Sequence, residues 1–303
     1  MSPITGSNHQ ATKLEALVKS QSENRTTSSP KNAKKTRFIA VTSGKGGVGK
    51  STISSNLAAS MSKMGLKVGI FDADIGLANL DVMFNVKIKK NILHVLKGEA
   101  NVSDILININ ENLVLIPGES GDEILKYSDE ALFERFMQEA HILDDLDVMI
   151  IDTGAGIGES IQLFLQAADD VIVVTVPDPA AITDAYATIK ITSKLRNDIA
   201  VIMNQVKNEK EAIGVYEKIK KVAYANIGGK LKLQLLGKIN VDTKVSQSVK
   251  KRVLFVNEHE LSQPARDINA IAKHIAKKLE RNVLVESDNS GLSGLFKRLM
   301  KHF

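Results

Sequence analysis

The segment Gly44–Ser51, with the sequence GKGGVGKS, constrains this chain more than any other part of it. It fits the pattern G-x-x-x-x-G-K-[ST], in which glycines let successive backbone N–H groups curl around a phosphate. An apolar run ending near Thr42 precedes it, and Ser51–Met64 has the pattern of a helix closed by Gly65. A strand, a glycine-rich loop and a helix in this order predict a phosphate-binding loop at a helix N-terminus.

The rest of the body predicts a sheet that is buried on both faces. Short β-branched runs alternate with helical patterns, and Val148–Ile151 is apolar without polar alternation, which is typical of parallel strands covered by helices. We expect strands at Phe38–Thr42, Val68–Phe71, Leu113–Ile116, Val148–Asp152, Val171–Val176, Ile199–Asn204 and Leu231–Ile239. The predicted fold is a three-layer α/β domain with a mostly parallel sheet, over residues 37–285.

Composition excludes several classes of protein. The 303 residues are 43% hydrophobic and 25% charged, as in a globular protein. The absence of cysteine excludes disulfide frameworks, thiol nucleophiles and cysteine-ligated metals. The sequence shows neither a secretory signal nor a run of the ~18 apolar residues that span a bilayer. We therefore expect a cytoplasmic protein.

The net charge of +5 is concentrated at the two ends of the chain. Residues 1–37 hold seven Lys and Arg against two Glu, and residues 290–303 hold three more cations. The body between them is slightly acidic, which disfavours DNA as a partner. Residues 1–36 are predicted to be an N-terminal extension, in which Gln21–Thr36 is a polar linker. The helical pattern of Ala11–Val18 fits either a frayed end or a partner-binding helix.

The phosphate-binding loop predicts how a nucleotide and Mg²⁺ are held. Lys50 is placed to reach the β- and γ-phosphates, and the Ser51 hydroxyl to ligate Mg²⁺. The predicted nucleotide-binding residues of the loop are Gly44, Lys45, Gly46, Gly47, Val48, Gly49, Lys50, Ser51 and Thr52.

Two carboxylates follow predicted strands on the side where ligands bind. Asp74 comes after Val68–Phe71, and Asp152 ends the next strand of this kind. Ligands of open α/β sheets lie at the carboxyl ends of the strands. We expect Asp152 to hold Mg²⁺ directly or through water, and Asp74 to orient the attacking water. Asp72 is either a supporting residue of the site or a cap of the strand end.

The string Lys45–Thr52 resembles the deviant Walker A motif of the MinD/ParA group of P-loop ATPases. In that group the lysine in the position of Lys45 reaches across a nucleotide-sandwiched dimer to the partner's phosphates, which implies a homodimer when ATP is bound and a catalytic role for Lys45. Phe71–Asp81 is similar to the switch I segment of the group, which implies that Asn79 and Asp81 lie at the dimer interface. Residues 148–158 look like switch II.

The residues expected to bind the adenine base of the nucleotide are inferred from the same resemblance. Asn204 matches the position whose side-chain amide meets the adenine edge, and Asp242 falls in a second base-contacting turn, which lacks the usual proline here. Together with Mg²⁺ these residues complete the expected ATP site. The six histidines show no ligand spacing, so no other metal site is expected.

The C-terminal segment has the pattern of a basic amphipathic helix after a polar linker, within residues 286–303. The residues expected at a membrane are Leu292, Leu295, Phe296, Lys297, Arg298, Leu299, Met300 and Phe303. At 1.5 Å per residue the helix is too short to cross a ~30 Å hydrocarbon core, so it would lie on an anionic surface. One copy binds weakly, and two copies in a dimer gain avidity of about 10²–10⁴-fold. The alternative is a helix packed on the protein's own core.

The N-terminal segment Asn8–Glu15 resembles the D-Q-A-x-x-L-R segment of the FlhG (FleN/YlxH) family, MinD relatives that limit flagellar number and placement. In that family the segment stimulates the GTPase FlhF; here His9 replaces the Asp and Glu15 the Arg. The resemblance implies an ATPase that acts with FlhF and flagellar basal-body components at the cytoplasmic face of the inner membrane.

Three alternative functions are also compatible with this phosphate-binding loop. The first is division-site selection of the MinD type. The second is DNA segregation of the ParA type, for which Lys250, Lys251 and Arg252 are the candidate contacts. The third is a small-molecule kinase, which Lys45 and the lack of an evident lid segment disfavour.

Overall fold

A computed structural model describes residues 36–74, 80–119, 123–124, 135, 138–281, 295 and 298–299. All of them belong to the unit Lys34–Phe303. Residues 1–35 of the N-terminal extension and Asn79 lie outside the described residues, as do Leu292, Phe296, Lys297, Met300 and Phe303 of the predicted membrane-binding face. Among the described residues, none of the helices has the length and apolar character required to cross a membrane.

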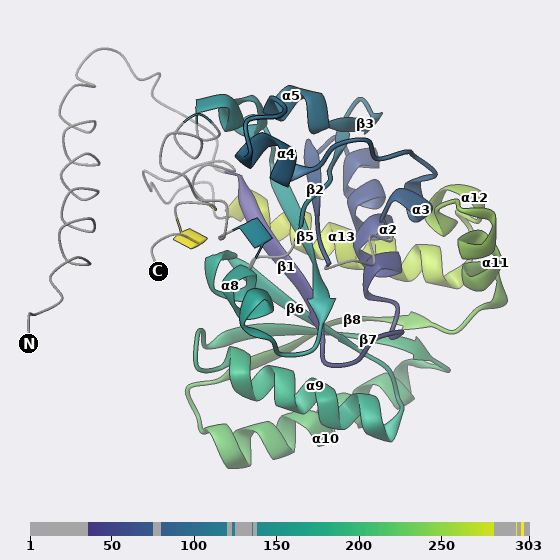
Figure 1. Ribbon diagram of the computed structural model, residues 1–303. Helices are drawn as coiled ribbons and strands as arrows, with labels where there is room; N and C mark the ends of the chain where they lie inside the picture. The colour runs from purple at the N-terminus through teal and green to yellow at the C-terminus, as the bar shows by residue number, and fades with distance from the viewer. Residues whose placement is uncertain are drawn as a thin grey trace, which may run out of the picture. The chain divides into compact units, whose positions relative to one another are not determined.

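The described strands form one eight-stranded sheet in the order β3-β4-β2-β5-β1-β6-β7-β8 (Figure 1). They are β1 (Arg37–Ser43), β2 (Val68–Ala73), β3 (Ile107–Asn110), β4 (Leu113–Ile116), β5 (Val148–Ala155), β6 (Asp170–Thr175), β7 (Asp198–Val206) and β8 (Lys232–Asn240). Every pairing is parallel except that of β3 with β4. The predicted fold class and its seven strands are confirmed. The sequence analysis missed β3, whose alternating burial differs from the continuous apolar runs used to find the others.

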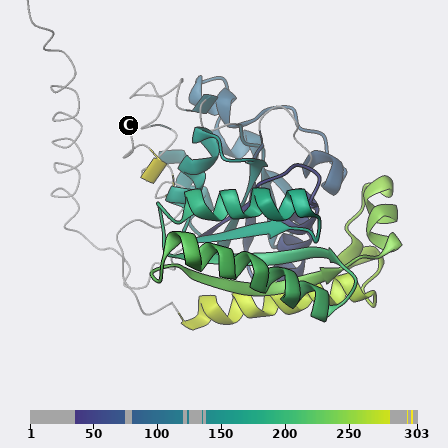
Figure 2. The ribbon, with the colours of Figure 1, turned by 90° about the horizontal axis from the view of Figure 1, so that it is seen from below.

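Helices cover both faces of the sheet, as Figures 1 and 2 show. They are α2 (Lys50–Lys63), α3 (Leu80–Phe84), α4 (Ile92–Leu96), α5 (Val102–Ile105), η1 (Ala140–Leu143), α8 (Glu159–Ala167), α9 (Pro179–Thr192), α10 (Glu209–Ile227), α11 (Thr243–Lys251), α12 (Phe255–Glu258) and α13 (Gln263–Arg281). In β1, Phe38 and Ala40 join the apolar cluster with α8, α9 and α10, whereas Ile39 and Val41 join the one with α2 and α13. The central strands are therefore buried on both faces, which explains their unbroken apolar sequences.

Three residues of the predicted amphipathic helix contact the body. Leu295 is 0% and Leu299 2% exposed, and both belong to the apolar cluster that contains Phe38. The Arg298 guanidinium lies 2.8 Å from Asp169 Oδ1 and 5.2 Å from the centre of the Phe38 ring. These three contacts are of the kind expected if the helix packs on the protein's own core. A protein surface can bury the apolar stripe of an amphipathic helix as a lipid surface does.

Candidate nucleotide-binding site

The predicted phosphate-binding loop joins the end of β1 to the start of α2. Gly47 and Gly49 have φ angles of 80° and 88°, left-handed values that glycine adopts without steric cost. No side chain caps the N-terminus of α2 at Gly49, so the first N–H groups of the helix face an anion site. At Gly44 a Cβ atom would lie 2.2 Å from the Asp184 carbonyl oxygen of α9. A glycine is therefore required where the loop leaves the sheet.

Lys50 brings the loop together with the ends of two strands. Its ammonium nitrogen lies 3.1 Å from Asp152 Oδ1 at the end of β5 and 3.8 Å from Asp74 Oδ2 beyond β2. Only 6% of Lys50 is exposed. The three residues assigned to phosphate, Mg²⁺ and the attacking water are therefore neighbours, although they come from separate parts of the chain.

Ser54 is a site residue that the sequence analysis missed. Its hydroxyl donates a 2.8 Å hydrogen bond to Asp152 Oδ1, the oxygen that also contacts Lys50. Ser54 lies four residues after Lys50 on α2 and hence on the same helix face. That spacing was the signal available in the sequence.

The residues around Asp152 fit a magnesium ion. Asp152 is 1% exposed, and its Oδ2 has no hydrogen-bond partner among the described residues. A buried carboxylate oxygen of this kind needs a proton, a donor or a cation. Together with the Ser51 hydroxyl it offers the hard oxygen donors that Mg²⁺ prefers. Among the described residues, no three or more His, Cys, Asp or Glu side chains are grouped so that they could hold a metal ion.

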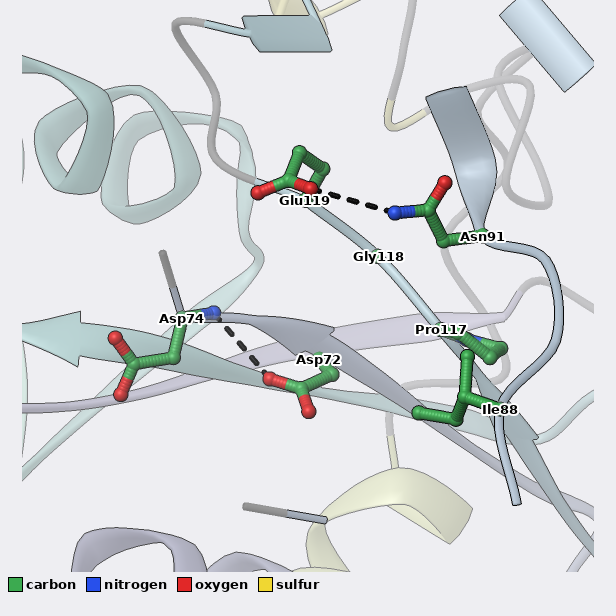
Figure 3. Close-up of a pocket in the computed structure, with 7 residues that line it drawn as sticks. All are labelled: Asp72, Asp74, Ile88, Asn91, Pro117, Gly118 and Glu119. Atoms are coloured by element: carbon green, nitrogen blue, oxygen red, sulfur yellow. Dashed lines mark hydrogen bonds between the residues drawn. The ribbon is translucent and has the colours of Figure 1, made fainter. Parts of the chain in front are cut away.

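Asp72 is both a strand-end cap and a buried carboxyl group of the site. It pairs in register with Asp152 across β2 and β5. Its Oδ1 accepts the Asp74 N–H at 3.3 Å (Figure 3). Asp72 is 3% exposed, and burial together with the charge of Asp152 raises its pKa to about 7. Asp72 therefore caps the end of β2 and lies beside Asp74 and Asp152, and its supporting role in the site stays a prediction.

A cavity of about 230 Å³ lies beside these carboxylates. It is lined by Asp72, Asp74, Ile88, Asn91, Pro117, Gly118 and Glu119 (Figure 3). The Asn91 amide donates to Glu119 Oε2 at 3.3 Å across its far side. At Gly118 a Cβ would lie 2.1 Å from the Asp72 carbonyl oxygen, so this wall of the cavity approaches β2 closely.

The two candidate base-binding residues lie in different settings. Asn204 is 8% exposed, and its amide donates a 2.8 Å hydrogen bond to the Val48 carbonyl of the phosphate-binding loop. Asp242 is the N-cap of α11, where its carboxylate accepts the Lys244 N–H at 2.9 Å. The structure therefore brings Asn204 to the loop and gives Asp242 a helix-capping contact.

Comparisons with known proteins show which family the chain belongs to. A family model described as "ParA: NUBPL iron-transfer P-loop NTPase" matches residues 34–276. The chain is 48% identical over 300 residues to the flagellum site-determining protein YlxH of Helicobacter pylori, which covers 97% of this chain and 99% of YlxH. The chain belongs to the FlhG (YlxH/FleN) branch of the MinD/ParA P-loop NTPases. The predicted family is confirmed.

Two further matches agree with this family. The antiactivator FleN of Pseudomonas aeruginosa is 32% identical over 88% of this chain and 94% of FleN. Among solved structures, the MinD cell division protein of Aquifex aeolicus matches with a TM-score of 0.64 and 26% identity, covering 80% of this chain and 97% of MinD. The resemblance stated from the motifs thus extends over the whole P-loop domain.

The MinD/ParA signature lysine, Lys45, lies at the surface of this chain. Its ammonium group is 3.3 Å from Asp178 Oδ1, and both side chains are about half exposed. Asp178 caps α9, and the Ala181 N–H, followed by Lys45, lowers its pKa. The predicted interface residue Asp81 accepts the N–H of its neighbour Val82. No pattern in the sequence indicated that Lys45 would contact Asp178.

The predicted switch II segment is tied to the phosphate-binding loop. The Gly156 N–H donates to the Ser43 carbonyl at 2.8 Å, and the Ser43 hydroxyl donates to the Lys45 carbonyl at 3.0 Å. A Cβ at Gly154 would lie 3.2 Å from Asp74 Oδ1. The end of β1 is therefore hydrogen-bonded both to the predicted switch II segment and to the loop.

Proposed function

We propose that this protein is an ATPase whose ATP-bound homodimer attaches reversibly to the cytoplasmic face of the inner membrane and regulates flagellar number and placement together with FlhF. The observation that carries the proposal is the 48% identity to a flagellum site-determining protein over almost the whole length of both chains. The grouping of Lys50, Asp74 and Asp152 supports the hydrolytic part.

The chemistry assigned to the site is slow hydrolysis of ATP. Bound Mg²⁺ would neutralise charge on the phosphate oxygens, held by the Ser51 hydroxyl and the Asp152 carboxylate. Lys50, which is paired with Asp152, would contact the β- and γ-phosphates of a bound nucleotide. Asp74 stands 3.8 Å from the Lys50 ammonium nitrogen and orients the attacking water.

Dimerisation is assigned to the face that carries Lys45. Its half-exposed ammonium group can leave Asp178 for a partner's phosphates at small cost, because an exposed ion pair contributes little. Ile157, just after the Gly156 turn of switch II, is 43% exposed. An apolar side chain at this place suits a surface that is buried when two copies meet.

Membrane attachment requires the C-terminal helix to leave the body, since Leu295 and Leu299 are buried there. Exposing a buried leucine costs roughly 1.5–3 kcal/mol, so one helix gains little from moving to lipid. Two helices in one dimer gain avidity. Helix α8 begins at the end of switch II and ends two residues before Asp169, the partner of Arg298. It therefore links switch II to the part of the body that contacts Arg298.

Liposome co-sedimentation with ATP or ADP, with and without FlhF, tests the proposal. Wild-type protein is expected to sediment with anionic liposomes in ATP and to stay in the supernatant in ADP. Lys45→Ala should bind ATP without dimerising, and a chain truncated before Gly291 should bind ATP without sedimenting. Light scattering that reports one particle mass in both nucleotides would contradict the proposal.

The alternatives are distinguished by liposome binding together with two further measurements, the FlhF GTPase rate and DNA affinity. If the protein selects division sites in the MinD manner, deletion of residues 1–36 leaves the FlhF GTPase rate unchanged, whereas the proposed function predicts a loss of stimulation. If it segregates DNA, DNA affinity falls steeply with salt and liposome binding is absent. Against DNA binding, Lys251 of the candidate basic cluster is already paired with Glu258 at 2.6 Å.

A further inference from the structure

Asn204 packs against the phosphate-binding loop from the side of β7. Its side-chain amide donates to the Val48 carbonyl at 2.8 Å, and Val48 itself is only 3% exposed. A Cβ atom at Gly49 would lie 2.5 Å from Asn204 Nδ2. The amide therefore occupies the space that a side chain at position 49 would need.

A bulge in β7 sets the direction of the Asn204 side chain. Met203 pairs with Lys238 and Val206 with Asn240, so Asn204 and Gln205 together face the single residue between those partners on β8. Gln205 has a φ of 54°, a left-handed value that is uncommon for a residue other than glycine. A bulge bends its strand and redirects a side chain. Here the redirected side chain is that of Asn204.

The direction of the Val48 carbonyl decides the direction of the next N–H group. In a trans peptide the C=O and the N–H point opposite ways, and the described residues contain no cis peptide bond. Glycines at positions 47 and 49 leave the neighbouring backbone torsions permissive. A hydrogen bond on the Val48 carbonyl therefore keeps the Gly49 N–H pointing away from Asn204, on the opposite side of that peptide plane.

We propose that Asn204 is a positioning residue of the phosphate-binding loop, holding the Val48 peptide in the orientation that receives a phosphate whether or not a base is bound. The inference rests on the proposed nucleotide-binding function and adds to the expected adenine contact. An asparagine amide has two N–H donors and one acceptor. After one donor is used on Val48, a donor and an acceptor remain, the pair that matches an adenine edge. One side chain thus serves both ends of the nucleotide.

Inorganic tripolyphosphate with Mg²⁺ separates these roles, because it has phosphates and no base. Calorimetric titration of Asn204→Ala with magnesium tripolyphosphate should show affinity lower by about three- to tenfold, the range of one net hydrogen bond. Affinity for MgATP should fall at least as much. The control is Asn226→Ala, which removes the same kind of bond, from an amide to the Val222 carbonyl at 2.8 Å, on the exposed surface of α10. It should change neither affinity.

Hydrogen exchange of the nucleotide-free protein gives a second readout. The amides of Gly46–Gly49 should exchange faster in Asn204→Ala than in wild-type protein and Asn226→Ala. If Asn204→Ala fails to fold, variants of the bulge residue Gln205 test the inference instead. Gln205→Gly keeps the left-handed turn and should bind tripolyphosphate as wild type does, whereas Gln205→Val disfavours that turn and should weaken binding.

Two results would overturn the inference. One is an Asn204→Ala protein with weakened ATP binding and unchanged tripolyphosphate affinity, since Asn204 would then contact the base alone. The other is a wild-type protein that binds MgATP but no magnesium tripolyphosphate, since the loop would then not be held ready for phosphates without a base; the proposed function would still stand. If wild-type protein binds tripolyphosphate but never dimerises with ATP, the proposed function fails, and the ratio of the two affinities still decides the role of Asn204.

Discussion

The Lys50 ammonium nitrogen lies 3.1 Å from Asp152 Oδ1, so a buried ion pair joins the phosphate-binding loop to the end of β5. Residues 102 positions apart in sequence meet at this point. Two further carboxylates, Asp72 and Asp74, lie at the neighbouring end of β2. The Lys50 ammonium group therefore lies among the carboxyl groups of two strand ends.

Lys50→Ala should lower ATP affinity by roughly 10–100-fold, because a hydrogen bond to a charged group contributes about 1.5–3 kcal/mol. Nucleotide titration and light scattering would show weak binding and a monomer in ATP. Lys63→Ala is the matched control on the same helix, since Lys63 pairs with the exposed Glu260 and donates to the Val256 carbonyl at 3.3 Å, at the other end of α2 from the loop. A Lys50→Ala protein that still dimerises with ATP would argue against the mechanism.

Asp74→Ala should bind ATP and remain an ATP-locked dimer on membranes while its hydrolysis slows. Loss of a group that handles the attacking water costs about 10²–10⁴-fold in rate. Phosphate release at saturating MgATP measures this effect, and light scattering reports the dimer. Asp145→Ala is the control, because that side chain is 88% exposed and pairs only with Lys67. Unchanged hydrolysis in Asp74→Ala would remove Asp74 from the reaction.

Asp72→Asn should change how stability depends on pH in the absence of metal and nucleotide. The pKa of Asp72 rises from 3.8 to about 7 in the fold. Below pH 3.8 the Asp72 carboxyl group is neutral in both the folded and the unfolded protein, so its burial does not lower the free energy of unfolding. Between the two values the folded protein binds a proton that the unfolded chain releases, so wild-type stability falls with rising pH, by up to about 4 kcal/mol in all.

Thermal unfolding in a chelating buffer measures this difference. The unfolding temperature of Asp72→Asn should exceed that of the wild type at about pH 8, and the gap should shrink toward about pH 4. A gap that is the same at both pH values would show that the Asp72 carboxyl is not the titrating group.

Gly44→Ala should destabilise the protein by about 1–3 kcal/mol, the usual cost of overpacking. Its Cβ would meet the Asp184 carbonyl oxygen at 2.2 Å, backbone that has little room to move. Gly46→Ala is the comparison, because a Cβ there has nothing within 4 Å. Chemical denaturation should place Gly46→Ala close to the wild type, and equal stability of the two variants would contradict the close approach at Gly44.

Local sequence was sufficient for the central strands and for predicting the main candidate site residues. Continuous apolar runs marked the central strands, because a strand buried on both faces has no polar alternation. The edge strand β3 was not predicted because its residues alternate between partly buried and exposed positions. The glycine-lysine pattern of residues 44–51 located the loop, and a polar residue after a buried strand located Asp74, Asp152 and Asn204.

What the tertiary structure alone decided is which of these side chains meet. The contact of Asn204 with Val48 joins residues 156 positions apart, and that of Arg298 with Asp169 joins residues 129 apart. The amphipathic pattern of the last helix is equally compatible with a lipid surface and with a protein groove, since both remove the same apolar stripe from water. Sequence patterns report the faces of an element; the packing of the sheet and its helices determines which surface those faces contact.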